Sequence, residues 1–241
     1  MTPLPVSSCH VESFRSACTR LAVLRETTLS NQPAKVPAIT VRRLSLYAKQ
    51  LSRLGETGTE VVSSGTLADM CGFNPAQIRK DLAYFGDFGV RGMGYYVQEL
   101  LFEIRKILGG DKQWRLGLVG AGNLGCALLK HGQSADSEYN FVAAFDKKGK
   151  RVGLEIAGVR IEPLKAINHA VEEKQVEIGV IAVKAVWAQE VADMLVRAGI
   201  CGILNFSFAQ IECPGHVPVE NVDFSTKFDK LCYQIKSKAR C

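Results

Sequence analysis

The sequence has 241 residues, 47% of them hydrophobic, and its 30 lysines and arginines against 24 acids give a formal net charge of +6. This length suits two domains of unequal size. No apolar run approaches the roughly 18 residues of a membrane helix, and no signal-peptide core is present, so we expect a cytoplasmic protein without membrane contact. Eight cysteines without a C-x-x-C pair fit neither a metal site nor a disulfide scaffold.

The N-terminal third predicts a tail followed by helices. Residues 1–36 carry prolines, serines and threonines without a sustained period, which predicts a loosely ordered tail. Apolar residues at spacings of three and four predict a first helix over 39–54. A short second helix follows over 67–70, with Ser63 and Ser64 as candidate caps.

A third helix begins at Asn74-Pro75, with asparagine as the cap and proline at the first helical position. Three short helices in this order indicate a helix-turn-helix. The glycine-punctuated stretch 86–94 predicts a hairpin, the wing of a winged helix, and 96–108 predicts a fourth helix. The winged-helix domain therefore spans 37–110.

Basic residues on this domain make it a candidate for binding double-stranded DNA. Arg79 and Lys80 are adjacent on the third helix, so one can reach base edges in the major groove while the other contacts a phosphate. Two neighbouring basic residues are also typical of a solvated helix face, and that alternative stays open. The complete candidate DNA-binding set is Arg42, Arg43, Ser63, Ser64, Asn74, Gln77, Arg79, Lys80, Tyr84 and Arg91.

From 111 onward the pattern alternates between strands and helices. The expected segments are 114–120, 122–131, 139–146, 164–173, 176–183, 187–198, 202–206 and 221–224. Such alternation predicts an α/β domain over 111–224, a parallel sheet with helices on both faces. Residues 225–241 then form a terminal helix with an apolar face.

The run Gly120-Ala121-Gly122-Asn123-Leu124-Gly125 is the strongest motif of the chain. It lies between an expected strand and an expected helix, the context in which G-x-G-x-x-G indicates a dinucleotide site. Gly120 allows the turn, Gly122 lets a pyrophosphate approach the backbone, and Gly125 lets helix and strand pack closely.

An acid follows at the end of the next expected strand. Asp146 lies 21 residues after Gly125, where a carboxylate can accept hydrogen bonds from the adenosine ribose and repel a 2′-phosphate. This favours NAD over NADP. The adjacent Lys147 and Lys148 are either solvated loop residues or groups that would neutralise such a phosphate.

Several motifs together resemble the Rex family of redox-sensing transcriptional repressors. They are Gln77 to Gly86, Val90 to Tyr95, the glycine run, Gly202 to Phe206 and Glu220 to Phe224, and the resemblance covers about 37–235. It implies a homodimer of winged-helix and Rossmann domains with exchanged terminal helices. Such proteins bind palindromic operators when NAD⁺ prevails and leave them when NADH binds.

The resemblance also implies roles for individual residues. Arg79 and Lys80 correspond to the recognition helix, Arg91 to the wing, and Asp223 with Phe224 to the surroundings of the nicotinamide and the subunit interface. The full set of candidate cofactor-binding residues is Gly120, Ala121, Gly122, Asn123, Leu124, Gly125, Asp146, Lys147, Val183, Lys184, Asn205, Phe206, Asp223 and Phe224.

Three positions depart from the family pattern. His131 replaces a tyrosine, Lys184 falls where a proline is usual, and Phe208 replaces another proline. Lys184 either touches the cofactor at the strand edge or is a solvated loop residue. These departures leave open a DNA-binding dimer with altered or lost redox sensing. A small NAD-dependent oxidoreductase is disfavoured, because no catalytic arrangement of histidines and no substrate domain are evident.

Overall fold

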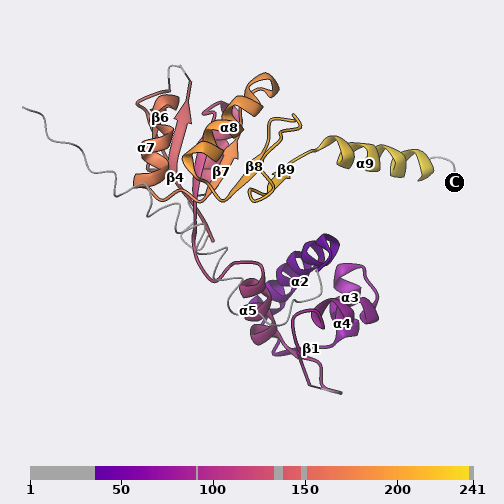
Figure 1. The fold of residues 1–241 in the computed structure, drawn as a ribbon. Helices are drawn as coiled ribbons and strands as arrows, with labels where there is room; N and C mark the ends of the chain where they lie inside the picture. The colour runs from indigo at the N-terminus through magenta and orange to yellow at the C-terminus, as the bar shows by residue number, and fades with distance from the viewer. Residues whose placement is uncertain (1–35, 91, 133–137, 148–150, 239–241) are drawn as a thin grey trace, which may run out of the picture. The chain divides into compact units, whose positions relative to one another are not determined.

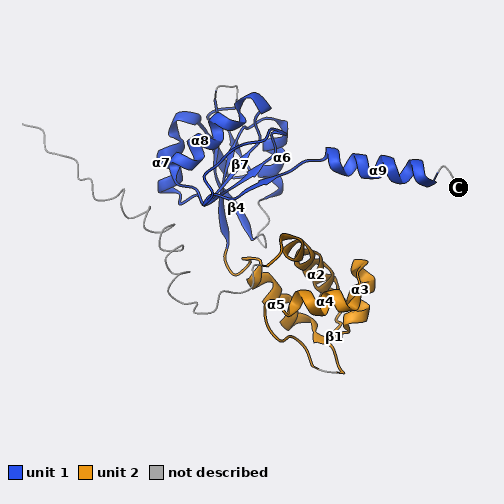
Figure 2. Cartoon of the chain, turned by 45° about the vertical axis from the view of Figure 1, so that its right-hand side comes forward, with its two compact units in different colours: residues 1–24, 113–241 blue, residues 25–112 orange. Residues whose placement is uncertain are grey.

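A computed structural model of the protein describes residues 36–90, 92–132, 138–147 and 151–238 (Figure 1). These residues divide between two compact units, one within 25–112 and the other within 113–241 (Figure 2). The division falls two residues after the boundary that the sequence suggested. Over the stretches that the structure describes, no helix has both the length and the apolar character to cross a bilayer.

The described residues of the N-terminal unit form four helices and a two-stranded sheet. Its elements are α2 (Ala38–Glu56), β1 (Val61–Val62), α3 (Ser64–Cys71), α4 (Pro75–Leu82), β2 (Tyr95–Tyr96) and α5 (Val97–Ile107). The caps explain the boundaries. Ser63 accepts a hydrogen bond from the Thr66 amide at the start of α3, and Asn74 accepts one from the Ala76 amide at the start of α4.

The core of this unit lies between α2, the helix pair α3 and α4, and α5. Leu44, Tyr47 and Leu51 of α2 are fully buried against Ile78 of α4 and Ile104 of α5. Within the hairpin expected over 86–94, Val90 and Gly94 form an isolated antiparallel bridge. The two-stranded ladder itself joins β1 to β2.

The C-terminal unit is built on a seven-stranded sheet of order β5-β6-β4-β3-β7-β8-β9, parallel except for β5. Its strands are β3 (Trp114–Val119), β4 (Tyr139–Asp146), β5 (Glu155–Ile156), β6 (Val159–Pro163), β7 (Ile178–Ile181), β8 (Gly202–Asn205) and β9 (Val219–Asn221). The chain runs outward from β3 to β4 and β6, then crosses to β7 on the other side of β3. The carboxyl ends of β3 and β7 therefore form the topological switch point, where open α/β sheets bind ligands.

Helices cover both faces of this sheet. They are α6 (Asn123–His131), the 3₁₀ turn η1 (Leu164–Ala166) with α7 (Ile167–Glu173), and the 3₁₀ turn η2 (Ala185–Trp187) with α8 (Ala188–Ala198). Buried residues of α7 and α8 form one apolar cluster with Val119 and Phe145, whereas Leu129 of α6 joins the cluster on the other face. The expected fold class, a winged helix followed by a Rossmann-type parallel sheet, is confirmed.

Two details of the sheet differ from the expectation. The hairpin of β5 and β6 was not predicted, and the strand expected at 221–224 is observed as β9, two residues earlier. The last helix, α9 (Ser225–Lys238), begins where the sequence placed it. Its residues are exposed along its whole length, including Phe228, Leu231 and Ile235.

Candidate dinucleotide site and nucleic-acid interface

The glycine loop between β3 and α6 has the geometry that its motif requires. Gly120 has φ +104°, a conformation that disfavours side chains, and a Cβ there would lie 2.6 Å from the Ala182 carbonyl oxygen. A Cβ at Gly125 would collide with the Gly120 carbonyl oxygen. A Cβ at Gly122 would meet nothing within 4 Å, so the backbone of the loop is accessible from that side.

The first turn of α6 has backbone N–H groups without intrahelical acceptors, and these groups and the helix dipole favour an anion at this end. Asp146, at the end of β4, is held against the same loop. Its two carboxylate oxygens accept hydrogen bonds from the backbone amides of Ala121 (2.9 Å) and Lys147 (2.7 Å). The donors and the carboxylate together fit a dinucleotide, with pyrophosphate at the helix start and ribose hydroxyls near Asp146.

Arg151 is a further basic residue at this loop, and the sequence analysis did not single it out. Its guanidinium donates hydrogen bonds to the Ala121 carbonyl oxygen, to Oδ1 of Asn123 (3.0 Å) and to Sγ of Cys126 (3.0 Å). It thereby adds positive charge next to the anion-binding end of α6. The only signal in the sequence was its place in the basic run that follows Asp146.

Three more candidates lie along the same edge of the sheet. Val183 packs beside the glycine turn, since a Cβ at Gly120 would lie 2.9 Å from its Cγ1. Lys184 is exposed and precedes η2 in an extended conformation. The ammonium group of Lys147 lies 3.7 Å from the centroid of the Trp187 ring. A role for Lys184 in cofactor binding stays a prediction.

A hollow of about 260 Å³ lies beyond the ends of β8 and β9, and Asn205, Phe208, Asn221 and Asp223 are among the residues that line it. Asn205 is buried, and its amide is fully used within the protein. It donates to the Ala209 carbonyl oxygen and to Oδ1 of Asn221, both at 2.8 Å, and accepts from the amide and hydroxyl of Ser207. Asn205 therefore shapes this hollow, and a hydrogen bond to a ligand would displace one of these contacts.

One aromatic residue, Phe208, lines this hollow, and a second, Phe224, lies near Phe208. The rings of Phe208 and Phe224 are 6.1 Å apart between centroids, and both side chains are exposed. Phe208 has φ +60°, a conformation that proline cannot adopt, so the loop has a backbone course of its own where the family pattern has proline. Phe206 packs partly buried against the α6 side of the sheet. Hydrogen bonds from the backbone and hydroxyl of Ser225 lower the pKa of Asp223.

In the N-terminal unit, α4 has two different faces. Ile78, Asp81 and Leu82 are buried, whereas Arg79 and Lys80 are exposed. The Arg79 guanidinium donates a hydrogen bond of 2.8 Å to the Ser64 hydroxyl at the start of α3. An exposed basic face on the third helix is what a recognition helix needs for phosphates and base edges.

A hydrogen-bond network around Asp81 occupies the buried face. Arg43 donates to both carboxylate oxygens at 2.6 and 2.7 Å, and Tyr47 and Gln77 donate at 2.8 and 2.9 Å. Burial alone would raise the pKa of Asp81, but these hydrogen bonds outweigh it and hold the pKa below its ordinary value. Arg43 and Gln77, which the sequence assigned to DNA, thus have structural roles here, and DNA contacts by them stay predictions.

The remaining candidates for DNA contact are placed as follows. Ser63 and Asn74 cap α3 and α4, Arg42 is exposed on α2, and Tyr84 lies half-buried just after α4. Arg91 lies outside the described residues. The structure thus brings Ser64 and Arg79 together.

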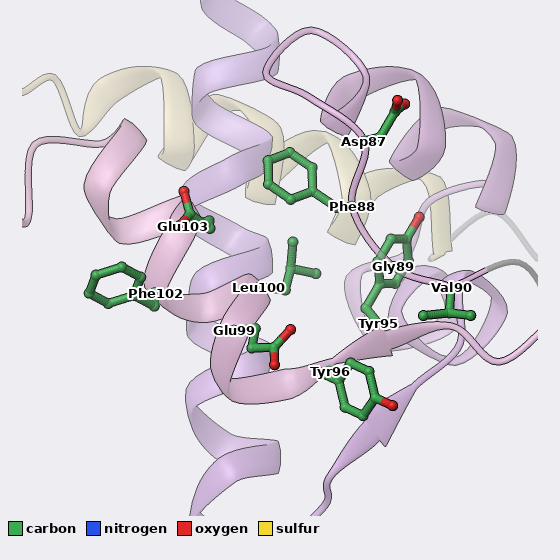
Figure 3. A pocket seen from close by; sticks show the side chains of 10 residues that line it. All are labelled: Asp87, Phe88, Gly89, Val90, Tyr95, Tyr96, Glu99, Leu100, Phe102 and Glu103. Carbon is green, nitrogen blue, oxygen red and sulfur yellow. The ribbon is translucent and has the colours of Figure 1, made fainter.

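The N-terminal unit has a hollow of about 420 Å³ between the segment 87–90, β2 and α5 (Figure 3). Its lining combines aromatic rings with three carboxylates, namely Phe88, Tyr95, Tyr96, Phe102, Asp87, Glu99 and Glu103. Carboxylates repel phosphate oxygens, so this hollow suits neither DNA nor a dinucleotide diphosphate. The basic face of α4 is the better candidate for DNA.

Two family models match the chain. One is described as "Putative DNA-binding protein N-terminus" and matches residues 35–83, and the other, "CoA binding domain", matches residues 111–209. The chain is 48% identical over 203 residues to the redox-sensing transcriptional repressor Rex of Syntrophobacter fumaroxidans, which covers 84% of this chain and 97% of that relative. It is 43% identical to the Rex repressor of Desulforamulus reducens over 86% of this chain and 98% of that relative.

Solved structures give a similar result. A crystal structure of RSP, a Rex-family repressor, in complex with β-NAD⁺ and operator DNA is 33% identical, with a TM-score of 0.80. The match covers 86% of this chain and 95% of that one. The same protein in complex with β-NADH is 32% identical, with a TM-score of 0.79 over 86% of this chain and 97% of that chain.

Proposed function

Since this chain belongs to the Rex family of redox-sensing transcriptional repressors, we propose that it represses transcription from operator DNA and is released when NADH binds. One observation carries the proposal: a single chain holds an exposed basic helix in one compact unit and a dinucleotide loop in the other. The cofactor is then a signal of the NADH/NAD⁺ ratio and not a reagent. A repressor acts where the DNA is, which agrees with the cytoplasmic expectation.

Different residues of the C-terminal unit would contact different parts of the dinucleotide. The start of α6 and Arg151 face the diphosphate, Asp146 accepts hydrogen bonds from ribose hydroxyls, and the hollow at β8 and β9 is the candidate for the nicotinamide. The nicotinamide ring is cationic in NAD⁺ and neutral in NADH. For the two forms to act differently, NADH and NAD⁺ must favour different conformations of the protein, each binding its own conformation more tightly.

A homodimer is the assembly that α9 supports. Phe228 is 65% exposed, Leu231 50% and Ile235 60%, an apolar face that none of the described residues buries. A second copy of the chain that exchanges this helix would cover it, and two recognition helices would then read a palindromic operator with half-sites about one helical turn apart. The Leu231→Glu variant is expected to sediment as a monomer, with Glu220→Gln as the dimeric control. A dimeric Leu231→Glu variant would contradict this assembly.

Altered redox sensing is the second candidate function, and the backbone of Phe208 favours it. Where the family has a proline, this loop adopts φ +60°, next to the hollow proposed for the nicotinamide. A protein of this kind would bind the operator but respond equally to both redox forms, or to neither. An oxidoreductase has less support, because His169 pairs with Glu173 on an exposed surface and no acid-base arrangement faces the glycine loop among the residues described.

A gel-shift titration on a palindromic site, at constant salt, tests these alternatives. Graded NADH is expected to release the DNA at concentrations where NAD⁺ does not. Because coupling between two sites is reciprocal, saturating operator DNA should weaken NADH binding by the same factor. Equal responses to the two forms would favour the second candidate, and an NADH affinity unchanged by DNA would contradict the proposed switch.

A further inference from the structure

A contact between Lys147 and Trp187 bridges two loops at the carboxyl edge of the parallel sheet. Lys147 follows β4, and Trp187 lies in η2 between β7 and α8. The Lys147 ammonium group is 3.7 Å from the centroid of the indole ring, a cation–π contact. In the sheet order β4 and β7 flank β3, so the two residues reach toward each other from both sides of the strand that leads into the glycine loop.

Two exposed apolar residues lie side by side in this loop. Trp187 is 45% exposed and follows Val186, which is 81% exposed. Trp187 therefore presents a large aromatic surface at the switch point of the sheet, where α/β domains bind ligands. Among the residues that the structure describes, a lysine contacts its ring face, and the long side chain of that lysine can move away.

We propose that Trp187 is the stacking surface for the adenine base, and that Lys147 covers it until a nucleotide enters. The inference rests on the proposed function, because it names a subsite within the same dinucleotide site. A neutral purine ring can replace an ammonium group on an indole face without leaving a buried charge. Lys147 then turns toward solvent or the diphosphate, where its charge is favourable.

The positions of the neighbouring residues identify the base as adenine and not nicotinamide. Asp146, the candidate partner of the adenosine ribose, directly precedes Lys147 in the chain. The base attached to that ribose must therefore lie near Lys147, and so near the indole that Lys147 touches. The hollow proposed for the nicotinamide lies at β8 and β9, on the other side of β3 from Asp146.

Intrinsic fluorescence with ADP-ribose as the probe tests this proposal directly. The chain has two tryptophans, and the other, Trp114, is at the amino end of β3, opposite the glycine loop. ADP-ribose carries adenine, ribose and diphosphate but no nicotinamide, and it does not emit in this range. We expect ADP-ribose and AMP to quench the wild-type emission, nicotinamide mononucleotide to leave it unchanged, and the Trp187→Phe variant to show no quenching.

Calorimetry then separates stacking from mere proximity. Trp187→Leu should bind ADP-ribose roughly tenfold more weakly, the usual size of one base–aromatic stack, whereas Trp187→Phe should stay within about threefold of wild type. Tyr139→Leu is the matched control, because Tyr139 is 50% exposed at the amino end of β4. Its affinity for ADP-ribose should equal that of the wild type.

Each other outcome overturns a specific statement. If Trp187→Leu binds ADP-ribose as tightly as wild type while NADH still releases the operator, the stacking proposal fails and the proposed function stands. The same holds if nicotinamide mononucleotide, and not AMP, quenches the emission. If the wild-type protein binds neither ADP-ribose nor NADH, both the proposed function and this subsite fail.

Discussion

The two units of the chain place their candidate functional residues differently. In the N-terminal unit, α4 carries the exposed Arg79 and Lys80 on one face and the buried Asp81 on the other, so one short helix serves both surface and core. In the C-terminal unit, Asp146 is the last residue of β4 and Lys184 follows β7, and the interiors of both strands are apolar. The candidate polar side chains Asp146 and Lys184 therefore lie at the edge of the sheet and not within an apolar cluster.

The difference predicts different responses to substitution. The orientation of α4 depends on polar contacts of Asp81 with Arg43 and Tyr47, two residues of α2. A change in this network should therefore disturb stability and DNA binding together. Changes at the loops of the sheet should alter ligand binding without loss of DNA binding, because a rigid scaffold positions loops that can vary independently.

Asp81→Ala is expected to have the largest effect. It leaves the buried Tyr47 hydroxyl and the Arg43 guanidinium, whose side chain is only 14% exposed, without their acceptor. Removing one partner of such a pair costs about 3–5 kcal/mol of unfolding free energy. Urea unfolding should show this loss, and gel shifts should show loss of operator binding, whereas NADH binding should persist.

Asp69→Ala is the control for that substitution, because Asp69 is an exposed acid on the neighbouring helix α3. Its unfolding free energy should stay within about 0.5 kcal/mol of wild type. If Asp81→Ala were equally well tolerated, the coupling between core and DNA-binding surface in α4 would not exist.

Gly125→Ala should come next in size. The added Cβ collides with the Gly120 carbonyl oxygen, a backbone atom that cannot move without disturbing the turn. We expect a loss of about 2–3 kcal/mol in unfolding free energy from overpacking, and a severe loss of NADH affinity by calorimetry.

Gly215→Ala provides the matched control, since a Cβ there meets nothing within 4 Å. Operator binding by Gly125→Ala should persist but no longer respond to NADH. Loss of operator binding by Gly125→Ala would contradict the expectation that a change in the glycine loop leaves DNA binding intact.

Local patterns in the sequence predicted most of the architecture and much of the candidate site. Ser63 and Asn74 marked the starts of α3 and α4, and strand, loop and acid located the candidate nucleotide site. Long-range contacts were not predictable in this way. In the sequence, Asp81 resembles any acidic residue of a helix, and only the fold brings it to Arg43, 38 residues away. Likewise, Arg151 reaches the glycine loop only through the tertiary fold.

Arg79→Ala should have a smaller and more selective effect than the first two substitutions. The residue is exposed and donates one hydrogen bond to the hydroxyl of Ser64, so the fold should change little. If it reads a base edge, operator affinity should fall by about 1–2 kcal/mol and discrimination at one base pair should relax. Binding measured on operators with single base changes checks this, and unaltered discrimination would contradict base contact by Arg79.

Lys80→Ala should have the smallest effect. We expect it to weaken the salt dependence of DNA binding and to leave sequence specificity unchanged. Lys80 is exposed beside Arg79, and a lysine that contacts a phosphate contributes mainly through released counterions. The slope of log affinity against log salt should therefore fall by about 1, with equal weakening on operator and unrelated DNA. Because the same helix buries Asp81, unfolding must be measured in parallel: an unchanged unfolding curve with a reduced slope assigns the effect to the outer face of α4 alone.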